Sequence, residues 1–420
     1  MHKFEKYSSY KDSGVEWLGK IPEHWDIKKM KYITKFISGF PFNSQKFDKY
    51  EGINVVRIGD IKDKIDLSKC IKSLENKIHK NTMINRNDTL VALSGATTGK
   101  SCFIYEDIKE TYINQRIAKF NYSNSFLYYC ISNEKFKKDI LLGADGSAQE
   151  NVSISTIENM FIPFPSDIEQ TKIASFLDEK TAQIDKAISQ KEKLIELLKE
   201  YRQIIINEAV TKGLNKDVEF KDSGVEWIGM IPKHWKIIKF KHLFYEKKKA
   251  HNINLNCGSI SFGKVVKKDE EKVPVSTKAS YQVLNKGEFL INPLNLNYDL
   301  KSLRIALSDL DVVVSSGYIV IKNRIDLDKN YFNWLLHRYD IAFMKTLGAG
   351  VRQTLNYQDI GETLLVNPPK EEQGKIAEYI EIQTTKIDKA IKLQQNYIDK
   401  LKEYKASLID NVVTGKVRIV

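Results

Sequence analysis

The stretch GATTGKS, at residues 95–101, is the first candidate for chemistry because it resembles a phosphate-binding loop. A nucleotide-binding loop of that class has four residues between its glycines, whereas this stretch has three. A helix should also follow such a loop, but the next residues, SCFIYEDI, predict a strand. We therefore expect no nucleotide hydrolysis here. Two interpretations remain, a simple tight turn and a basic loop that lies on a DNA backbone.

A second candidate is NPPK at residues 367–370, which is similar to the Asn-Pro-Pro-aromatic motif of adenine methyltransferases. That motif needs an aromatic fourth residue to stack on a flipped base, and Lys370 cannot stack. The aligned stretch of the first half is FPSD (164–167), and no glycine-rich cofactor loop precedes either one. The prolines instead predict the end of a globular part, just before a helix begins.

The remaining polar residues show no catalytic pattern. The seven histidines form no HExxH or other paired ligand spacing, so we predict no metal site. His24 and His234 recur within a repeated IPxHW phrase, which favours a structural imidazole. No serine or aspartate pattern indicates a nucleophile with its base. We therefore expect that the chain is not an enzyme.

That repeated phrase organises the whole chain. KDSGVEWLGKIPEHW (11–25) returns as KDSGVEWIGMIPKHW (221–235), and twelve of the fifteen positions are identical. A second pair closes each half, QTKIASFLDEKTAQIDKAI (170–188) and QGKIAEYIEIQTTKIDKAI (373–391), and the match continues through 197–213 and 400–416. The centres, roughly 26–145 and 236–348, are unlike. Two copies of one scaffold that diverge only in their centres predict a protein that recognises two different things. The tryptophans of the phrase should lie in the core, namely Trp17, Trp25, Trp227 and Trp235.

The closing stretches predict two long helices with heptad patterns. At about 1.5 Å per residue, each would be on the order of 65 Å long and would need a partner for its apolar seam. We expect the two helices to pair antiparallel, with Lys191 roughly facing Gln394; separate packing of each helix on its own domain is the alternative. The second seam position (d) should hold Ala187, Leu194 and Tyr201 in the first helix and Ala390, Tyr397 and Tyr404 in the second. The first seam position (a) should hold Leu177, Ile184, Lys191, Leu198 and Ile205, and Ile380, Ile387, Gln394, Leu401 and Leu408.

Within each half the pattern indicates a mixed α/β domain. Expected strands include 53–61, 88–95, 115–120, 287–293, 303–308 and 311–321, and expected helices include 124–142 and 329–346. The predicted fold is α/β, with two such domains joined by two long helices in an antiparallel coiled coil and an internal pseudo-two-fold repeat. The expected boundaries are 1–168 for the first domain, 169–213 for its helix, 214–370 for the second domain, and 371–420 for the second helix and tail.

Composition limits the class of protein and of partner. At 420 residues, two or three domains are expected, and the net charge of +12 indicates an acidic partner such as nucleic acid. The four cysteines form no CxxC pair, which predicts reduced thiols. The first residues lack the apolar region of a signal peptide, and no apolar run approaches about 20 residues. We expect a cytoplasmic protein with no membrane segment.

The duplicated phrase SGVEWLGKIPEHW, and GSAQENVSISTIENMFIPFPSDIEQTKIASFLDEKTAQID at 146–185, resemble the specificity subunit of type I restriction-modification systems. GAGVRQTLNYQDI (348–360) fills the corresponding place in the second half. The resemblance implies two target-recognition domains that read a bipartite double-stranded DNA site, with the helices setting the gap. It also implies no cofactor on this chain. Two modification subunits would bring S-adenosylmethionine and methylate an adenine in each half, and restriction subunits would bring ATP and Mg.

Side-chain chemistry suggests which residues contact DNA. Arg and Lys suit guanine, Asn and Gln suit adenine, and Lys, Ser and Thr suit phosphates. For each candidate, an ordinary exposed loop side chain is the alternative. A duplicated coiled-coil scaffold protein without DNA recognition is the alternative for the whole chain. The candidates are Thr97, Thr98, Lys100, Arg116, Gln149 and Asn151 in the first domain, and Arg304, Arg352, Gln353 and Asn356 in the second.

Overall fold

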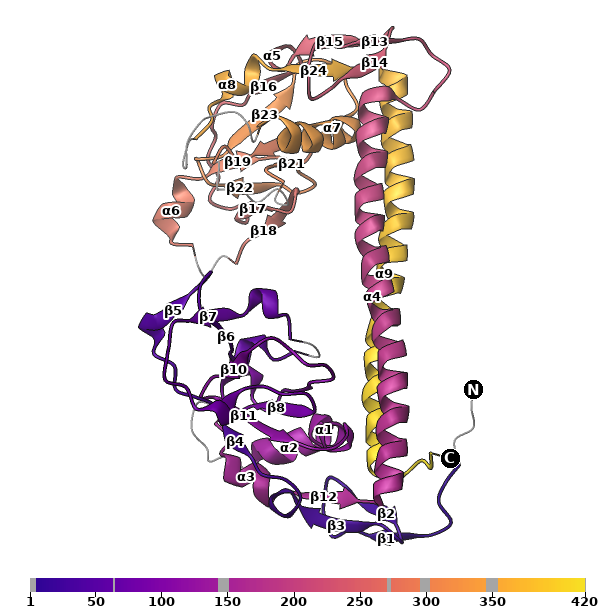
Figure 1. Cartoon of the computed structure of the whole chain (residues 1–420). Coiled ribbons are helices and arrows are strands. Elements are labelled where there is room, and N and C mark those ends of the chain that lie inside the picture. The colour runs from indigo at the N-terminus through magenta and orange to yellow at the C-terminus, as the bar shows by residue number, and fades with distance from the viewer. Residues whose placement is uncertain are drawn as a thin grey trace. The chain divides into compact units, whose positions relative to one another are not determined.

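The computed structural model describes residues 5–62, 65–142, 151–269, 273–294, 303–344 and 354–419 (Figure 1). The chain divides into two compact units, each of which contains segments of both long helices. The first unit comprises Met1–Glu192 and Gln395–Val420, and the second comprises Lys193–Gln394. None of the described helices is long and apolar enough to cross a membrane.

The first unit contains two short strand pairs and two four-stranded sheets. The pairs are β1 (Tyr10–Asp12) with β2 (Lys20–Pro22), and β3 (Asp26–Lys29) with β12 (Phe161–Phe164). One sheet has the order β10-β6-β7-β5 (Thr111–Ile113, Ile53–Val56, Ile71–Ser73 and Phe47–Asp48), in which β10 and β6 are parallel. The other has the order β4-β11-β8-β9 (Ile37–Ser38, Ile117–Asn121, Asp88–Ala92 and Ser101–Phe103). Helices α1 (Phe126–Ser132), α2 (Glu134–Leu142) and α3 (Ile154–Asn159) complete the globular part.

The second unit repeats the two strand pairs but builds its centre differently. The pairs are β13 (Phe220–Asp222) with β14 (Met230–Pro232), and β15 (Lys236–Lys239) with β24 (Leu364–Asn367). A four-stranded sheet has the order β16-β23-β20-β21 (Phe244–Glu246, Ile319–Asn323, Phe289–Ile291 and Ile305–Leu307). Two further antiparallel pairs are β17 (Gly258–Ser261) with β18 (Lys264–Lys267), which form a hairpin, and β19 (Gln282–Leu284) with β22 (Val312–Val314). The helices are α5 (Phe240–Leu243), α6 (Val275–Ala279), α7 (Lys329–Ala342) and α8 (Tyr357–Gly361).

Two long helices, α4 (Asp167–Lys212) and α9 (Lys370–Val413), pair antiparallel (Figure 1). In the core of the first unit, Ile173 and Leu177 near the start of α4 pack with Leu408 and Val412 near the end of α9. In the core of the second unit the order is reversed, because the end of α4 packs with the start of α9 through Ile206, Val210, Ile376 and Ile380. The predicted fold, mixed α/β domains with an antiparallel pair of long helices, is confirmed.

The helices bury the second seam position that the heptads predict only in part, because Ala187 and Ala390 are half-buried and the four larger residues are exposed. The residues at position a are buried or half-buried, from Leu177 to Ile205 and from Ile380 to Leu408. Further buried positions lie four residues after some of these, at Thr181, Ile195, Thr384 and Ile398. Leu194, Tyr201, Tyr397 and Tyr404, expected at position d, are exposed. The Lys191 ammonium lies 4.6 Å from the centroid of the Tyr397 ring.

The seam shifts because each helix also covers its globular part. In the first unit, the Tyr129 hydroxyl lies 3.0 Å from the Thr181 hydroxyl and donates a hydrogen bond of 2.8 Å to Asp178. Asp178 also accepts hydrogen bonds from Ser125 and Tyr105. A helix face that serves both a partner helix and a globular core is wider than a two-stranded seam, so the buried positions follow spacings of three and four around a broader stripe.

The repeated phrase holds the ends of both helices in each unit, and its four tryptophans are buried as predicted. In the first unit, Trp25 donates a hydrogen bond of 3.2 Å to Glu169 in the first turn of α4. The same ring lies against Gly415, which follows the end of α9. In the second unit, Trp235 donates a hydrogen bond of 3.0 Å to Glu372 in the first turn of α9, and it contacts Gly213 after the end of α4. Each copy of the phrase therefore joins the start of one long helix to the end of the other.

Candidate nucleic-acid interface

The glycine loop of the first unit connects β8 to β9 as a tight turn. Gly95 and Gly99 have φ values of +74° and +76°, which only glycine adopts without strain. The Gly99 amide donates to the Ala92 carbonyl (2.9 Å), and the Thr98 hydroxyl donates to the Gly95 carbonyl (2.7 Å). Strand β9 follows the loop, as predicted, so the helix that a nucleotide-binding loop requires is replaced by a strand.

Five of the six predicted contacts of the first domain lie in this loop or beside its base. Lys100 is exposed at its end, and Thr97 is half-buried within it. The Leu93 amide donates to the Arg116 carbonyl (2.9 Å), and Ser94 forms a β-bridge with Asn151, so both segments flank the base of the loop. The side chains of Arg116 and Asn151 are exposed. The first unit thus places two cationic side chains, Lys100 and Arg116, and the amide of Asn151 beside the glycine loop. These groups suit phosphates and base edges. Gln149 lies outside the described residues.

The predicted residues of the second unit are placed differently. Arg304 is buried, and its Nε donates a hydrogen bond of 2.8 Å to Asp340, which is also buried. Such a guanidinium belongs to a structural ion pair in the core, where it cannot reach a base edge. Asn356 caps α8, because its side chain accepts a hydrogen bond of 2.9 Å from the Asp359 amide. Arg352 and Gln353 lie outside the described residues.

Sequence reasoning did not find the carboxylates that organise the phrase. His24 Nε2 lies 3.1 Å from Glu169, and His234 Nε2 lies 2.7 Å from Glu372. Burial opposes ionisation of Glu169, but the hydrogen bonds from His24 and Trp25 outweigh it and lower the pKa of that carboxyl. The signal was present, since a glutamate falls at the same place in the first turn of both helices.

The hairpin of β17 and β18 was also missed. Its sequence is GSISFGKVVK at 258–267, in which only the glycine of the Phe-Gly pair is typical of a two-residue hairpin turn. Phe262 at its turn is highly exposed, and Lys264, Lys267 and Lys268 are exposed beside it. This hairpin gives the second unit an exposed basic surface of its own.

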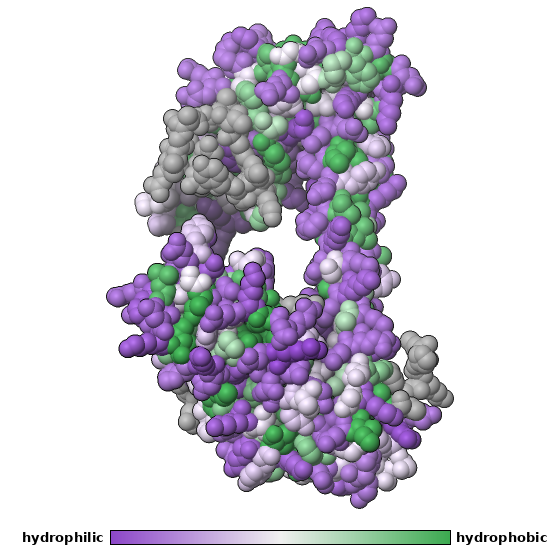
Figure 2. Space-filling model, viewed as in Figure 1, coloured by the Kyte–Doolittle hydropathy of each residue, from purple (hydrophilic) through white to green (hydrophobic). Residues whose placement is uncertain are grey.

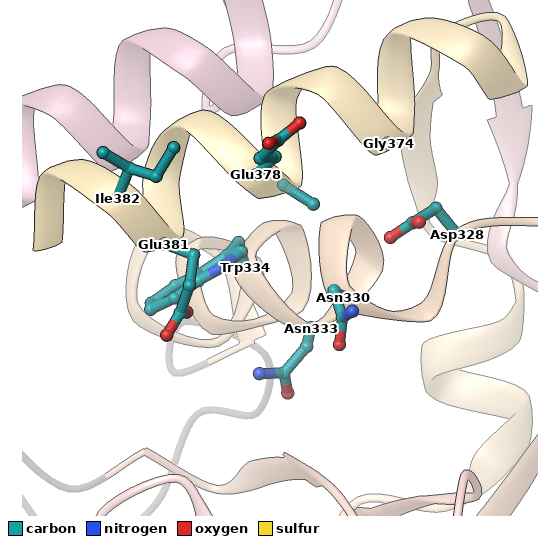
Figure 3. A pocket seen from close by; sticks show the side chains of 9 residues that line it. Asp328, Asn330, Asn333, Trp334, Gly374, Glu378, Glu381 and Ile382 are labelled. Carbon is teal, nitrogen blue, oxygen red and sulfur yellow. The ribbon is translucent and has the colours of Figure 1, made fainter. Parts of the chain in front are cut away.

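A cavity of about 540 Å³ in the second unit has the wrong charge for DNA. Figure 3 shows the Trp334 ring between α7 and α9, with Glu378 and Glu381 projecting from α9. Carboxylates repel a phosphate backbone, so this cavity is unsuited to nucleic acid. In the part of the chain that the structure describes, no group of three or more His, Cys, Asp or Glu side chains could hold a metal ion. The cavity is lined by Asp328, Asn330, Asn333, Trp334, Gly374, Ala377, Glu378, Glu381 and Ile382.

Comparison with known proteins gives one consistent result. Residues 22–197 match the type I restriction modification DNA specificity domain. The putative type I restriction enzyme MjaX specificity subunit of Methanocaldococcus jannaschii is 24% identical over 445 residues, which cover 99% of this chain and 98% of that protein. The EcoBI specificity subunit of Escherichia coli is 24% identical over 237 residues, which cover 53% of this chain and 47% of that protein.

Two solved structures share the fold. One is a chain from a study of complex assembly and conformational transition of the type I R-M system, with a TM-score of 0.69, 13% identity, and coverage of 94% of this chain and 98% of that chain. The other is the HsdS subunit from Thermoanaerobacter tengcongensis, with a TM-score of 0.51, 14% identity and the same coverage. Residues 22–197 therefore carry the DNA specificity domain, and the chain along its whole length is similar to the specificity subunits of type I restriction-modification systems and shares their fold.

Proposed function

We propose that this chain reads a bipartite DNA site, in which each unit contacts one half and the α4–α9 pair sets the gap between the halves. The main support for the proposal is that the two units share one scaffold but differ in their centres. The phrase, the strand pairs and the first turn of each long helix are built alike in the two units. The basic surfaces differ, since the first unit presents a glycine loop and the second a hairpin. Two different surfaces on one scaffold suit two different half-sites.

The chain acts within a larger complex, in the cytoplasm, and has no catalytic role of its own in this proposal. Modification subunits would bring S-adenosylmethionine and methylate an adenine in each half-site, and restriction subunits would bring ATP and Mg to cut unmodified DNA. The alternative of a scaffold protein without DNA recognition is not favoured, because the matched domain is a DNA specificity domain.

The DNA-reading role of the glycine loop in the first unit is tested with the complex assembled from this chain and its modification partner. We expect Arg116→Ala to lower affinity for the specific duplex by about tenfold or more, the loss of one good base contact. Discrimination should relax at one position of the first half-site only. Lys100→Ala should weaken binding to all sequences and reduce the dependence of binding on salt by about one phosphate contact.

Arg86 offers a matched control. It is an exposed arginine just before β8, whereas the glycine loop follows the other end of the same strand. Arg86→Ala should leave affinity and discrimination unchanged in fluorescence anisotropy titrations at several salt concentrations. Equal losses from Arg86→Ala and Arg116→Ala would mean that only general charge matters, and the assignment of this loop as a reading surface would be wrong.

A further inference from the structure

The β17–β18 hairpin has an unusual residue at its turn. Ser261 pairs with Lys264, so Phe262 and Gly263 form a two-residue connection, with φ values of +47° and +72°. Turns of this kind need positive φ at both positions and favour Asn, Asp or Gly at the first. A bulky residue with positive φ is strained, and such strain is retained where function requires the side chain.

Packing does not explain the presence of Phe262. Its side chain is 77% exposed, so it contributes little to any core. The backbone beside it is held closely, because a Cβ at Gly263 would lie 2.7 Å from Leu303 Cδ1. The turn is therefore pressed against the unit while the aromatic ring stands in solvent. A small polar residue would serve this turn better if the turn had only a structural role.

The charge around the ring fits a duplex. Lys264 and Lys267 are exposed on β18, which leaves the turn, and Lys268 is exposed directly after it. No acidic residue occurs between 258 and 268, and Asp269 follows. Lysines along this one arm can follow a phosphate backbone beside an inserted tip. A narrow two-stranded ribbon also fits a DNA groove.

We propose that this hairpin enters a groove of the second half-site and that Phe262 inserts there as a wedge at a base step. The inference rests on the proposed function and names a residue that carries it in the second unit. The Phe262 ring projects from the tip of the hairpin, so both of its faces are buried only if groups stack on both sides of it. An opened base step does so, whereas the floor of a groove would cover only the ring's edge. The lysines hold phosphates on the side of the arm that leaves the turn.

The experiment uses the complex of the full chain with its modification partner and duplexes that carry 2-aminopurine at successive positions of the second half-site. Unstacking of a base raises the fluorescence of 2-aminopurine. We expect a rise of about threefold or more at one step with the wild-type chain, which Phe262→Ala removes together with about tenfold of the affinity, the cost of losing a wedge contact. Flipping of the target adenine by the modification subunit also raises the signal at that base, but it should persist in the variant.

Two further variants keep the test independent of folding. Phe262→Asn suits the positive φ, so it should raise the thermal midpoint of the chain while still abolishing the fluorescence change. Val275→Ala removes an equally exposed apolar side chain (77%) from α6 of the same unit and should change neither signal nor affinity. A wild-type complex that binds its site without unstacking any step of the second half, or a Phe262→Asn chain that keeps the signal, overturns the wedge. A wild-type complex that does not bind DNA specifically overturns the proposed function instead.

Discussion

Gly415 shows how closely the repeated phrase meets the helix ends. It follows α9 with a φ of +71°, and a Cβ built there would lie 2.3 Å from Pro22 Cδ and 3.1 Å from the Trp25 ring. Two requirements therefore meet at one residue, a left-handed backbone and the absence of a side chain. Gly213 repeats the arrangement after α4, where a Cβ would lie 2.9 Å from the Trp235 ring.

Gly14 allows the two requirements to be separated. It has a similar φ of +67°, but nothing lies within 4 Å of a Cβ built there. We expect Gly14→Ala to lower the free energy of unfolding by about 1 kcal/mol, the cost of a left-handed alanine. Gly415→Ala should cost at least about 2 kcal/mol more, since Pro22 and Trp25 must move. Urea denaturation of the full chain measures both, and equal losses would show that the contact with Trp25 is not tight.

Residue roles were only partly predictable from the sequence. The tryptophans could be predicted as core because they recur within the repeat, and they are buried. The buried position of Arg304 could not be predicted, because an arginine in a β-rich segment gives no sign of the buried Asp340 that binds it from α7. The exposure of Phe262 could not be predicted, because only the turn geometry shows it.

At the scale of elements, the long helices followed from periodicity and from the prolines that precede them, whereas their seam did not. The heptad pattern treats each helix as one strand of an isolated coil, but in this chain each helix also packs on a globular part. Short strands were harder still. The expected strand 311–321 is two strands, β22 and β23, which a turn separates where the Tyr318 amide donates to the Ser315 carbonyl.

The position of the seam can be tested with two residues of α9. Ile398 is 1% exposed although the heptad leaves it outside the seam, and Tyr404 is 51% exposed although the heptad places it within. We expect Ile398→Ala to lower the free energy of unfolding by about 2–4 kcal/mol, because it leaves a cavity. Tyr404→Ala should change it by less than about 0.5 kcal/mol, as for other exposed positions. The reverse order in chemical denaturation would restore the predicted heptad seam.

The exposed apolar residues of the helices have a consequence beyond stability. Leu194, Leu197, Tyr201 and Ile204 follow one face of α4 at spacings of three and four residues, and Figure 2 shows apolar side chains among the hydrophilic ones along the helices. Contiguous apolar surface of this kind is typical of protein interfaces. It agrees with a chain that acts in a complex.

At the scale of the whole molecule, the repeat allowed the architecture and the class of function to be predicted together. Identical edges predicted a common scaffold, and the structure builds those edges alike in both units. The divergent centres could not be predicted in the same way. Each depends on long-range strand pairing, such as β10 with β6 in the first unit, and no local pattern specifies that pairing.

The central claim is that this chain selects one bipartite DNA site for methylation. A genome-wide map of N6-methyladenine in the host, with the gene deleted and then restored, tests that claim most directly. We predict that one bipartite motif loses its methylation on deletion and regains it on restoration, while every other methylated motif is unchanged. A methylation map that does not change, in cells where the chain is produced and co-purifies with its modification partner, would contradict the account.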